Sequence, residues 1–525
     1  MNAVKDIFLT RSPAQPVGIE AGLDEYLEPL DRARAAHLLR RTSLFGTAAD
    51  VSALIGRSAG EVVDELILNA RISPHPDDPP WANSLPPGRD APASVRQAYD
   101  SNNNTWVKDF RREWVGELYT GGLREKISLF WHDHFVTEIR TYKYAVFAHR
   151  YLKLLRTNSL QYFKTFVRRI GTDPSMLIYL NGDENRVGKP NENYARELLE
   201  LFTMSPQDEN NVDNYTEDDI KEISRALTGW VLSPTTGIAV LDPERYDSEE
   251  PKNIFGLEGS FDYDGVVDLI FDQRSPAIAN YMAQKLYALF VYDLPDASVV
   301  AELAQQLLDT DFAIFSAVAS LLKSQHFFDP TVFGTKTKDP VEFTFQLAKS
   351  TGRESSEELI EYLYRFIPLI DQELFNPPGV DGWPGYHNWI STSSLPMRWA
   401  VSDVILLGED GHMPPADLQP MAAELYDAND PEAAFYLPAA IADHLFAVEL
   451  SSIDIPEIPE DFGGDLISFP VPDAILNGPA HIRNLSKIFL GGAPWYEWFL
   501  YNQGSNERLL AYVHHLIQYP DYQLM

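Results

Sequence analysis

The chain contains, near its middle, the stretch Pro190-Asn-Glu-Asn-Tyr-Ala-Arg-Glu-Leu-Leu-Glu-Leu-Phe202, and the spacing of its apolar residues is that of an α-helix. Proline suits the first turn of a helix, and Asn191 can cap the amides that follow it. At about 100° per residue, four polar side chains share one wedge of this helix: Asn193, Arg196, Glu197 and Glu200. Apolar residues cover most of the remaining circumference, so we expect the helix to be largely buried.

Three interpretations of this polar wedge are open. It forms a solvated strip with an Arg196–Glu200 ion pair, a buried structural network of charges, or a set of catalytic or metal-binding carboxylates. A glycosidase built on Glu197 and Glu200 ranks low, because neighbouring carboxylates on one helix rarely flank a sugar from both faces.

Helical periodicity dominates the rest of the chain as well. Thr216-Glu-Asp-Asp219 has the pattern of a capping box at a helix start, and Gly229 marks a helix end. The helices that we expect lie at 31–41, 47–70, 95–118, 144–170, 191–204, 217–228, 276–292, 297–310 and 312–324. Strand patterns are few and short, at 237–241 and 466–469. The predicted fold class is mainly α, a large multi-helix globular body with long Pro-rich loops and a few short strands.

Proline-rich segments interrupt this helical pattern. Residues 71–94 contain seven prolines, too many for a helix interior, and residues 451–479 are also Pro-rich and acidic. We interpret both as surface loops, or alternatively as a lid or docking arm. The expected organisation is an N-terminal arm (1–30), a helical core (31–405), an acidic, Pro-rich insertion (406–480) and C-terminal helices (481–525) that pack back on the core.

Composition limits the function classes. Of the 525 residues, 45% are hydrophobic and 12% aromatic, which excludes a disordered chain. The net charge of −35 disfavours nucleic acid and anionic membranes as partners. Because cysteine is absent, there is no disulfide framework, thiolate nucleophile or thiolate metal site.

No targeting or membrane-spanning segment stands out in the sequence. The first residues lack the apolar run of a secretory signal, and no stretch of about 18 uncharged apolar residues occurs. As written, the sequence indicates a soluble cytoplasmic protein, or an extracellular or periplasmic one whose leader has been removed.

A second polar group lies in the aromatic stretch Phe130-Trp-His-Asp-His-Phe135. If this stretch is extended, His132 and His134 form a good ligand pair for a metal; if it is helical, they point apart. Both satisfied core histidines and a metal or acid–base role are open. In the second case the catalytic candidates are His132, His134, Glu197 and Glu200. The metal ligands would be His132, His134 and Glu197, with zinc, iron or manganese as the cofactor.

Two further segments are candidates for substrate binding. In His37-Leu-Leu-Arg-Arg41 the histidine and arginines share a helix face, either in structural salt bridges or as an anion clamp. The loop Phe375-Asn-Pro-Pro-Gly-Val-Asp-Gly-Trp-Pro-Gly-Tyr-His-Asn-Trp389 is irregular, and its rings either anchor it or stack on a sugar or partner. The substrate- or anion-binding candidates are His37, Arg40, Arg41, Asn193, Arg196, Trp383, His387 and Trp389. The chain lacks a P-loop, a dinucleotide fingerprint and an H-E-x-x-H motif.

In this order, a set of stretches resembles the bacterial domain-of-unknown-function 1800 (DUF1800) family. They are His37–Arg41, Leu129–Phe135, Asp173–Leu180, Asn191–Thr203, Tyr215–Asp219, Ala226–Trp230, Lys338–Glu342, Pro377–Pro384 and Tyr519–Gln523, and together they span nearly the whole chain. The sequence departs from the family pattern in lacking an export signal and in an expanded region around 411–479. It also carries Asp371 before Gln372, where the resemblance leads us to expect glycine.

The resemblance implies an exported protein, because members of the family look exported. They are often encoded beside a second family that resembles alkaline phosphatases and sulfatases. This association implies work on a cell-surface or extracellular polymer, with a partner of that superfamily or a polysaccharide as the binding partner.

Two function hypotheses are open. In the first, which we favour, the chain is a binding or assembly protein that acts with a partner on such a polymer, and its polar residues form a buried His/Arg/Glu network. The alternative is a metal-dependent enzyme, a hydrolase or an oxidase, that uses His132, His134, Glu197 and Glu200.

Overall fold

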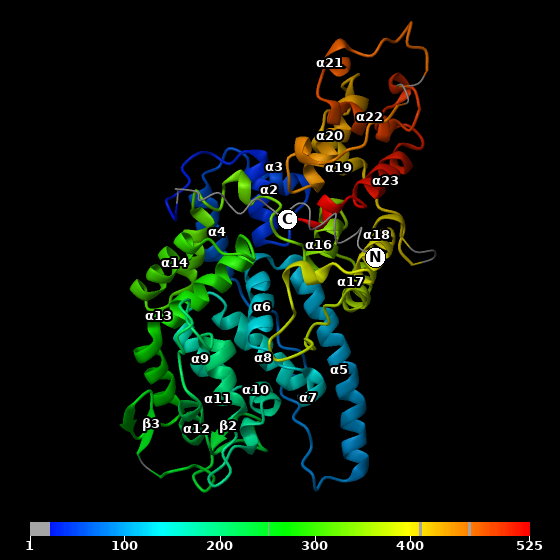
Figure 1. The fold of residues 1–525 in the computed structure, drawn as a ribbon. Helices are drawn as coiled ribbons and strands as arrows, with labels where there is room; N and C mark the ends of the chain where they lie inside the picture. Colours follow the sequence, from blue (N-terminus) through cyan, green and yellow to red (C-terminus); the bar gives the residue numbers. More distant parts are fainter. Residues whose placement is uncertain (1–21, 250, 409–411, 460–461, 463) are drawn as a thin grey trace.

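The computed structural model describes residues 22–249, 251–408, 412–459, 462 and 464–525, so most of the predicted N-terminal arm lies outside the described residues. Within them the fold is mainly α, as predicted (Figure 1). Two short antiparallel hairpins complete it: β1 (Trp230–Leu232) pairs with β2 (Ala239–Leu241), and β3 (Lys252–Ile254) with β4 (Leu257–Gly259). None of the described helices is long and apolar enough to cross a membrane.

The α-helices of the described residues are α2 (Arg32–Thr42), α3 (Ala48–Leu54), α4 (Ala59–Ile72), α5 (Ala93–Thr120), α6 (Gly122–His134), α7 (Ile139–Tyr142), α8 (Ala145–Asn158), α9 (Phe163–Ile170), α10 (Pro174–Tyr179), α11 (Asn193–Glu197), α12 (Glu217–Ala226), α13 (Tyr263–Phe290), α14 (Ala297–Asp309), α15 (Ile314–Lys323), α16 (Pro340–Ser350), α17 (Glu357–Phe366), α18 (Ser394–Leu407), α19 (Gln419–Leu425), α20 (Ala433–Leu445), α21 (Asp473–Leu476), α22 (Ala480–Leu490) and α23 (Ser505–Leu516). A π-helical segment, η2 (Leu198–Thr203), continues α11. The short 3₁₀ segments are η1 (Gly182–Glu184), η3 (Pro330–Val332), η4 (Ile367–Ile370), η5 (Tyr386–Trp389), η6 (Leu450–Ser452), η7 (Trp495–Glu497) and η8 (Pro520–Gln523).

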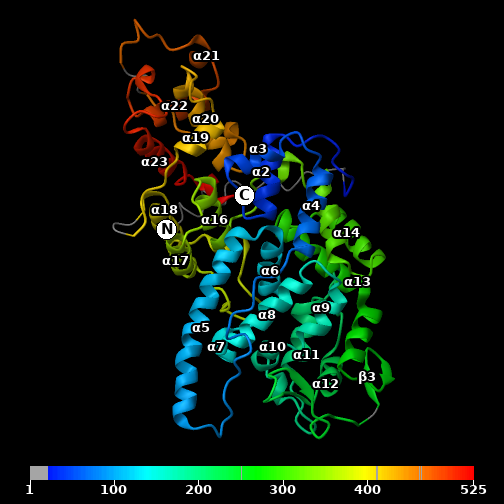
Figure 2. The ribbon, with the colours of Figure 1, turned by 180° about the vertical axis from the view of Figure 1, so that it is seen from behind.

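The helices form a large lower body and a smaller upper lobe (Figures 1 and 2). The lower body contains α4 to α15, with the long α5 along one side and α13 along the other. In the upper lobe α20 packs on α19 and α22, and α23 contacts both α22 and α18. The last residues lie between the two parts, beside α16, where Lys338 N–H donates to the Gln523 carbonyl at 2.8 Å (Figure 1).

Several predicted helices are confirmed, but some are divided. The stretch 47–70 splits into α3 and α4 at Gly56, whose φ of +81° lies in the left-handed region. The stretch 144–170 splits into α8 and α9, and 276–292 is the second half of α13, which kinks at Arg274. The capping box of Thr216 and Asp219 is present at the start of α12.

The backbone conformation explains two features of the sequence, at residues 466–469 and at Asp371. The strand predicted at 466–469 is wrong: the amides of Ile467 and Ser468 donate to the Asp465 carboxylate, which bends the chain into a turn. Asp371 has a φ of +79°. Such a backbone suits glycine and is also tolerated by aspartate, which explains the residue expected there from the resemblance.

A buried ionic network joins α6 to α16. Lys126 Nζ donates to Glu342 Oε1 at 2.5 Å, and these side chains are only 3% and 2% exposed. Glu342 also accepts the Asp339 N–H in a capping box at the start of α16. Burial alone would raise the pKa of Glu342, but Lys126 and Lys336 lower it below its ordinary value. The carboxylate is therefore ionised and paired in the folded protein.

We expect the substitution Glu342→Gln to destabilise the fold by about 3–5 kcal/mol, because the buried Lys126 loses its ion-pair partner and keeps only the weaker influence of Asp339. Glutamine still offers an oxygen to the Asp339 amide, so the loss reports the charge. The measurement is the free energy of unfolding in urea. The control is Glu65→Gln in the exposed Glu65–Arg57 pair, for which we expect a loss below about 1 kcal/mol. Equal losses for the two variants would contradict the buried pair.

Candidate functional site

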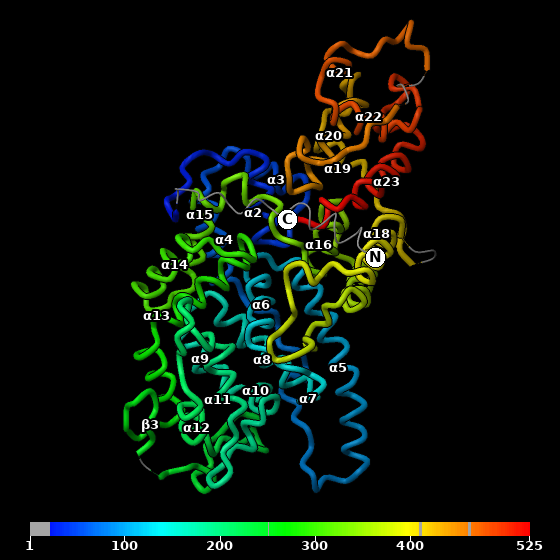
Figure 3. The backbone as a smooth tube through the Cα atoms, in the orientation of Figure 1, coloured from blue at the N-terminus to red at the C-terminus, as the bar shows by residue number. Residues whose placement is uncertain are grey.

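The last turn of α6 carries three consecutive polar residues that bind backbone groups of two irregular segments. His132 Nε2 accepts the Phe375 N–H at 2.8 Å, and Asp133 Oδ1 accepts the Trp383 N–H at 2.7 Å. His134 Nε2 donates to the Phe202 carbonyl at 3.0 Å. Figure 3 traces the segment between α17 and α18 across α6 to this turn. The structure thus joins three of the sequence motifs at one place.

The two histidines point apart because the stretch is helical. Both are buried, and burial lowers the pKa of His132 to about 4 and that of His134 to about 3, so both are neutral at neutral pH. Each Nε2 is already bonded to a backbone group. This geometry supports the interpretation as core histidines, with His132 Nδ1 left without a hydrogen-bond partner among the described residues.

No metal-ligand set is assembled in the described part of the chain. Those residues contain no group of three or more His, Asp or Glu side chains placed to hold an ion. The predicted ligands His132, His134 and Glu197 therefore receive no geometric support as a set.

The stretch 191–204 departs from the predicted α-helix. After α11 the backbone becomes π-helical over η2, so that carbonyls lose their usual partners and side chains replace them. The Thr203 hydroxyl donates to the Leu198 carbonyl at 2.6 Å, and the Tyr281 hydroxyl to the Leu201 carbonyl at 2.9 Å. His134 serves Phe202 in the same way. Such π-helical turns are frequent at functional sites.

The predicted Arg196–Glu200 ion pair is wrong. Arg196 instead donates to both carboxylate oxygens of Glu217 at 2.8 Å and approaches Glu192 at 3.4 Å. The partner could not be seen from the helix pattern, because Glu217 lies on the next helix. Glu197 and Glu200 remain half-buried, and neither is in an ion pair or side-chain hydrogen bond among the described residues.

We name Asp133, Glu197, Glu200 and Asp381 the carboxylate cluster. Burial raises the pKa of Glu197, and the charges of Glu200 and Asp381 raise it further. Burial raises the pKa of Asp133 to about 6, against the Trp383 amide and the Lys285 ammonium, which lower it. Burial lowers the pKa of Lys285, while Asp133 and Asp381 act in the opposite direction. The cluster therefore combines carboxylates from α6, α11, η2 and the 375–389 loop, and Lys285 of α13 lies within electrostatic reach of two of them.

Part of this cluster, and the neighbouring Lys285, gave little signal in the sequence. Asp133 lay between the two histidines, and Asp381 lay in the irregular loop, so both had a weak local signal. Lys285 gave no signal, because it lies in the middle of α13.

The loop rings mostly serve as anchors. Trp383 and Trp389 are each only 6% exposed, which leaves no ring face for a ligand. His387 is exposed and its ring lies 3.7 Å from that of Tyr386, and Asn193 is also exposed.

The predicted anion clamp has structural partners. Arg40 donates to the carbonyls of His444 and Phe446, both at 2.8 Å, and Arg41 to the carbonyl of Met525 at 2.7 Å. The expected carboxylate partners are replaced by backbone carbonyls from the distant end of the chain. His37 is buried between the rings of Phe327 and Phe333.

The pattern G-x-S-x-G of a nucleophile elbow occurs at 56–60 but lacks the elbow's context. Ser58 caps α4, its hydroxyl accepting the Glu61 N–H, and no strand precedes it between residue 22 and α4. The hydroxyl therefore serves the helix start.

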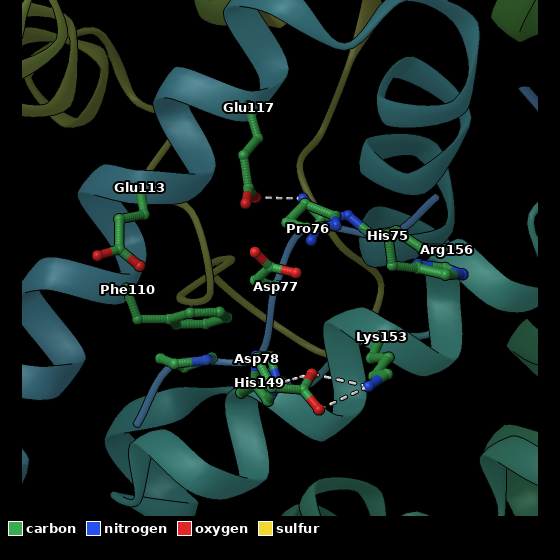
Figure 4. Close-up of a pocket in the computed structure, with 11 residues that line it drawn as sticks. His75, Pro76, Asp77, Asp78, Phe110, Glu113, Glu117, His149, Lys153 and Arg156 are labelled. Carbon is green, nitrogen blue, oxygen red and sulfur yellow. Dashed lines mark hydrogen bonds and ion pairs between the residues drawn. The ribbon is translucent and has the colours of Figure 1, made fainter. Parts of the chain in front are cut away.

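The Pro-rich segment 71–94 is fixed on the body at a small pocket between α5 and α8 (Figure 4). Asp78 pairs with Lys153 at 2.7 Å and with His149 at 3.1 Å, and the Arg156 guanidinium meets Glu117. A volume of about 30 Å³ holds little more than a water molecule. This pocket fastens the segment and offers no room for a larger ligand.

The pKa of Asp133 predicts a pH-dependent stability. A carboxyl whose folded pKa is raised contributes stability that is full below about pH 4 and is lost as the pH rises through about 6. Asp133→Asn keeps the oxygen that accepts the Trp383 amide but carries no charge. We expect the wild type to lose about 3 kcal/mol of unfolding free energy relative to this variant between about pH 4 and pH 8. The exposed control Asp24→Asn should follow the wild type; parallel profiles for Asp133→Asn would refute the buried carboxyl.

The conformation of Gly382 leads to a second prediction, on the stability of the 375–389 loop. Its φ is +82°, and a Cβ there would lie 2.3 Å from Asp133 Oδ1; Gly385 has a φ of +59° and nothing within 4 Å. Gly385→Ala therefore meets only backbone strain, about 1–3 kcal/mol, because its φ of +59° and ψ of −173° lie in a region almost confined to glycine. We expect Gly382→Ala to cost at least about 3 kcal/mol, since it also displaces the bond to the Trp383 amide. Urea unfolding and proteolysis of the loop measure the difference, and similar results for the two variants would contradict the docking geometry.

Comparison with known proteins places this geometry in a family. No curated protein and no solved structure matches the chain. The family model described as "Protein of unknown function (DUF1800)" matches residues 37–492, which include the end of α6, the π-helical segment and the 375–389 loop. The match confirms the resemblance of the motifs, and the chain belongs to the DUF1800 family.

Proposed function

We propose that the protein is a non-catalytic binding protein whose carboxylate cluster binds a neutral cell-surface or extracellular polysaccharide. One observation carries the proposal. The side chains suited to chemistry, His132 and His134, are buried and bonded to backbone groups, whereas Glu197, Glu200 and Asp381 are accessible and unpaired among the described residues.

The chemistry of the cluster favours hydroxyl groups as ligands. A carboxylate oxygen without a protein partner accepts a hydrogen bond from a sugar hydroxyl at little cost, because it is already partly desolvated. Tyr179 and Tyr215 lie close enough to Glu197 for its charge to raise their pKa, and they add aromatic surface to the same region. The negative charge of the cluster disfavours an anionic polymer.

The test is retention on a panel of neutral polysaccharides, with xylan, mannan, starch and β-glucan in native affinity gels. We expect retention on at least one of them, and at least about a tenfold weaker affinity for Glu197→Gln/Asp381→Asn, because two charge-assisted hydrogen bonds become neutral. The control Glu209→Gln/Glu258→Gln removes two exposed charges elsewhere and should retain wild-type affinity. Retention on no polysaccharide, or equal weakening by both variants, would overturn the proposal.

An enzyme is the second candidate, and the raised pKa of Glu197 and of Asp133 favours it. The polysaccharide that is retained is incubated with the protein, with and without chelator, and released sugars are counted. The binding proposal expects no release. Release that disappears in Glu197→Gln while binding persists would replace it by acid–base catalysis, and loss of release with chelator would identify a metal-dependent reaction.

A further inference from the structure

A second cavity, of about 430 Å³, lies away from the carboxylate cluster. The C-terminal end of α4, the start of α6 and the connection from α8 to α9 form its walls. This volume is in the range of small-molecule sites and exceeds what a bare inorganic ion fills.

The charge of the lining is opposite to that of the protein. Its ionisable side chains are Arg71, His75, Arg124, Arg156 and Arg169, and no Asp or Glu lines it. The chain as a whole has 77 acidic and 42 basic residues, so an all-basic cavity is a local reversal of the overall charge. Clefts lined by one sign of charge concentrate ligands of the other sign.

Carboxylates of the protein balance the charge of two of the arginines. Arg156 donates through Nε and Nη2 to the buried carboxylate of Glu125, at 2.8 Å for its shortest contacts, and also meets Glu117. Arg124 lies 3.5 Å from the same Glu125 and donates to the carbonyls of Ser73 and Pro74. These two side chains shape the wall, and their charge is balanced.

The other two arginines keep their charge for a ligand. Arg71 stacks on the Phe315 ring, 3.9 Å from its centre, and Arg169 donates to Asn158 Oδ1 at 3.0 Å. Both are exposed, and neither is in an ion pair with a carboxylate of the described residues. A stacked or hydrogen-bonded guanidinium is held in place and still presents donors, which suits bidentate binding of an oxyanion.

The start of α9 adds to the positive potential. Tyr162 and Thr165 line the cavity, and the Ncap residue Tyr162 makes no side-chain capping bond. The Phe163 N–H of this turn is bonded to the Phe312 carbonyl at 3.0 Å, so the helix start adds only the partial positive charge of the amides that follow it.

We propose that this cavity binds an organic oxyanion, a phosphate or sulfate ester on a sugar-sized body, through Arg71 and Arg169. The arginines take the oxyanion, and the remaining volume, lined by neutral side chains such as Ser159 and Gln161, takes the body of the ligand. The site is separate from the carboxylate cluster, and the inference does not depend on the polysaccharide proposal.

The test is calorimetric titration of the full chain with glucose 6-phosphate, glucose 6-sulfate, inorganic phosphate, inorganic sulfate and glucose. We expect saturable binding of at least one ester, no binding of glucose, and a weaker affinity at raised salt. The ester that binds more tightly identifies the source of the oxyanion. Arg71→Gln/Arg169→Gln should weaken that affinity at least tenfold.

The matched control is Arg89→Gln/Arg186→Gln, which removes two exposed positive charges elsewhere and should change the affinity less than twofold. Because Arg71 and Arg169 are exposed, their variant is expected to fold, and its urea midpoint checks this. Absence of ester binding, or an equal loss in both double variants, would overturn the site. Equal affinity for the ester and its inorganic ion would overturn the organic ligand. The polysaccharide test is repeated with Arg71→Gln/Arg169→Gln. Its retention reports on the carboxylate cluster alone and its ester binding on the cavity alone, so a failure of this site is distinguished from a failure of the proposed function.

Discussion

The architecture around the carboxylate cluster depends on the bonds made by the last turn of α6. A backbone amide or carbonyl in an irregular segment has no ladder partner, and when buried it must find a side chain. His132 and Asp133 satisfy amides of the 375–389 loop, and His134 satisfies a carbonyl of the π-helical segment. One helix end thereby provides the hydrogen-bond partners that two irregular segments lack. It needs an acceptor side chain for each amide and a donor side chain for the carbonyl.

These hydrogen bonds explain why two histidines that resemble a catalytic motif have a structural role. A buried imidazole with a lowered pKa is neutral, so it presents one donor and one acceptor of fixed identity. The tautomers are set by their partners: His132 accepts at Nε2, and His134 donates there. Held in this way, the loop and the π-helical segment place Asp381 and Glu197 within electrostatic reach of one another. The candidate site is thus formed by carboxylates within these motifs, more than by the histidines themselves.

The sequence predicted those features whose causes are local. The Thr216 capping box and most helix starts depend on residues within one turn, and both were found. Helix α6 was not predicted, because Glu125 and Lys126 are buried beside apolar residues and blur its periodicity. The π-helical turn could not be predicted either, since its carbonyls are satisfied by Tyr281 and His134 from other elements. For the same reason Arg196 was given the wrong partner, and Lys285 was overlooked.

Helix α6 also connects the two candidate binding regions. Arg124 near its start lines the arginine cavity, and Asp133 near its end belongs to the carboxylate cluster. Nine residues at the helical rise of about 1.5 Å separate their backbones by about 14 Å. Across about 14 Å, two unit charges interact by only about 1 kcal/mol at an effective dielectric constant of about 20, so the opposite charges of the two regions act on each other weakly. A single rigid helix can therefore hold a negative and a positive region in fixed relation while each keeps its own electrostatic character, and substitutions in the two should have additive effects.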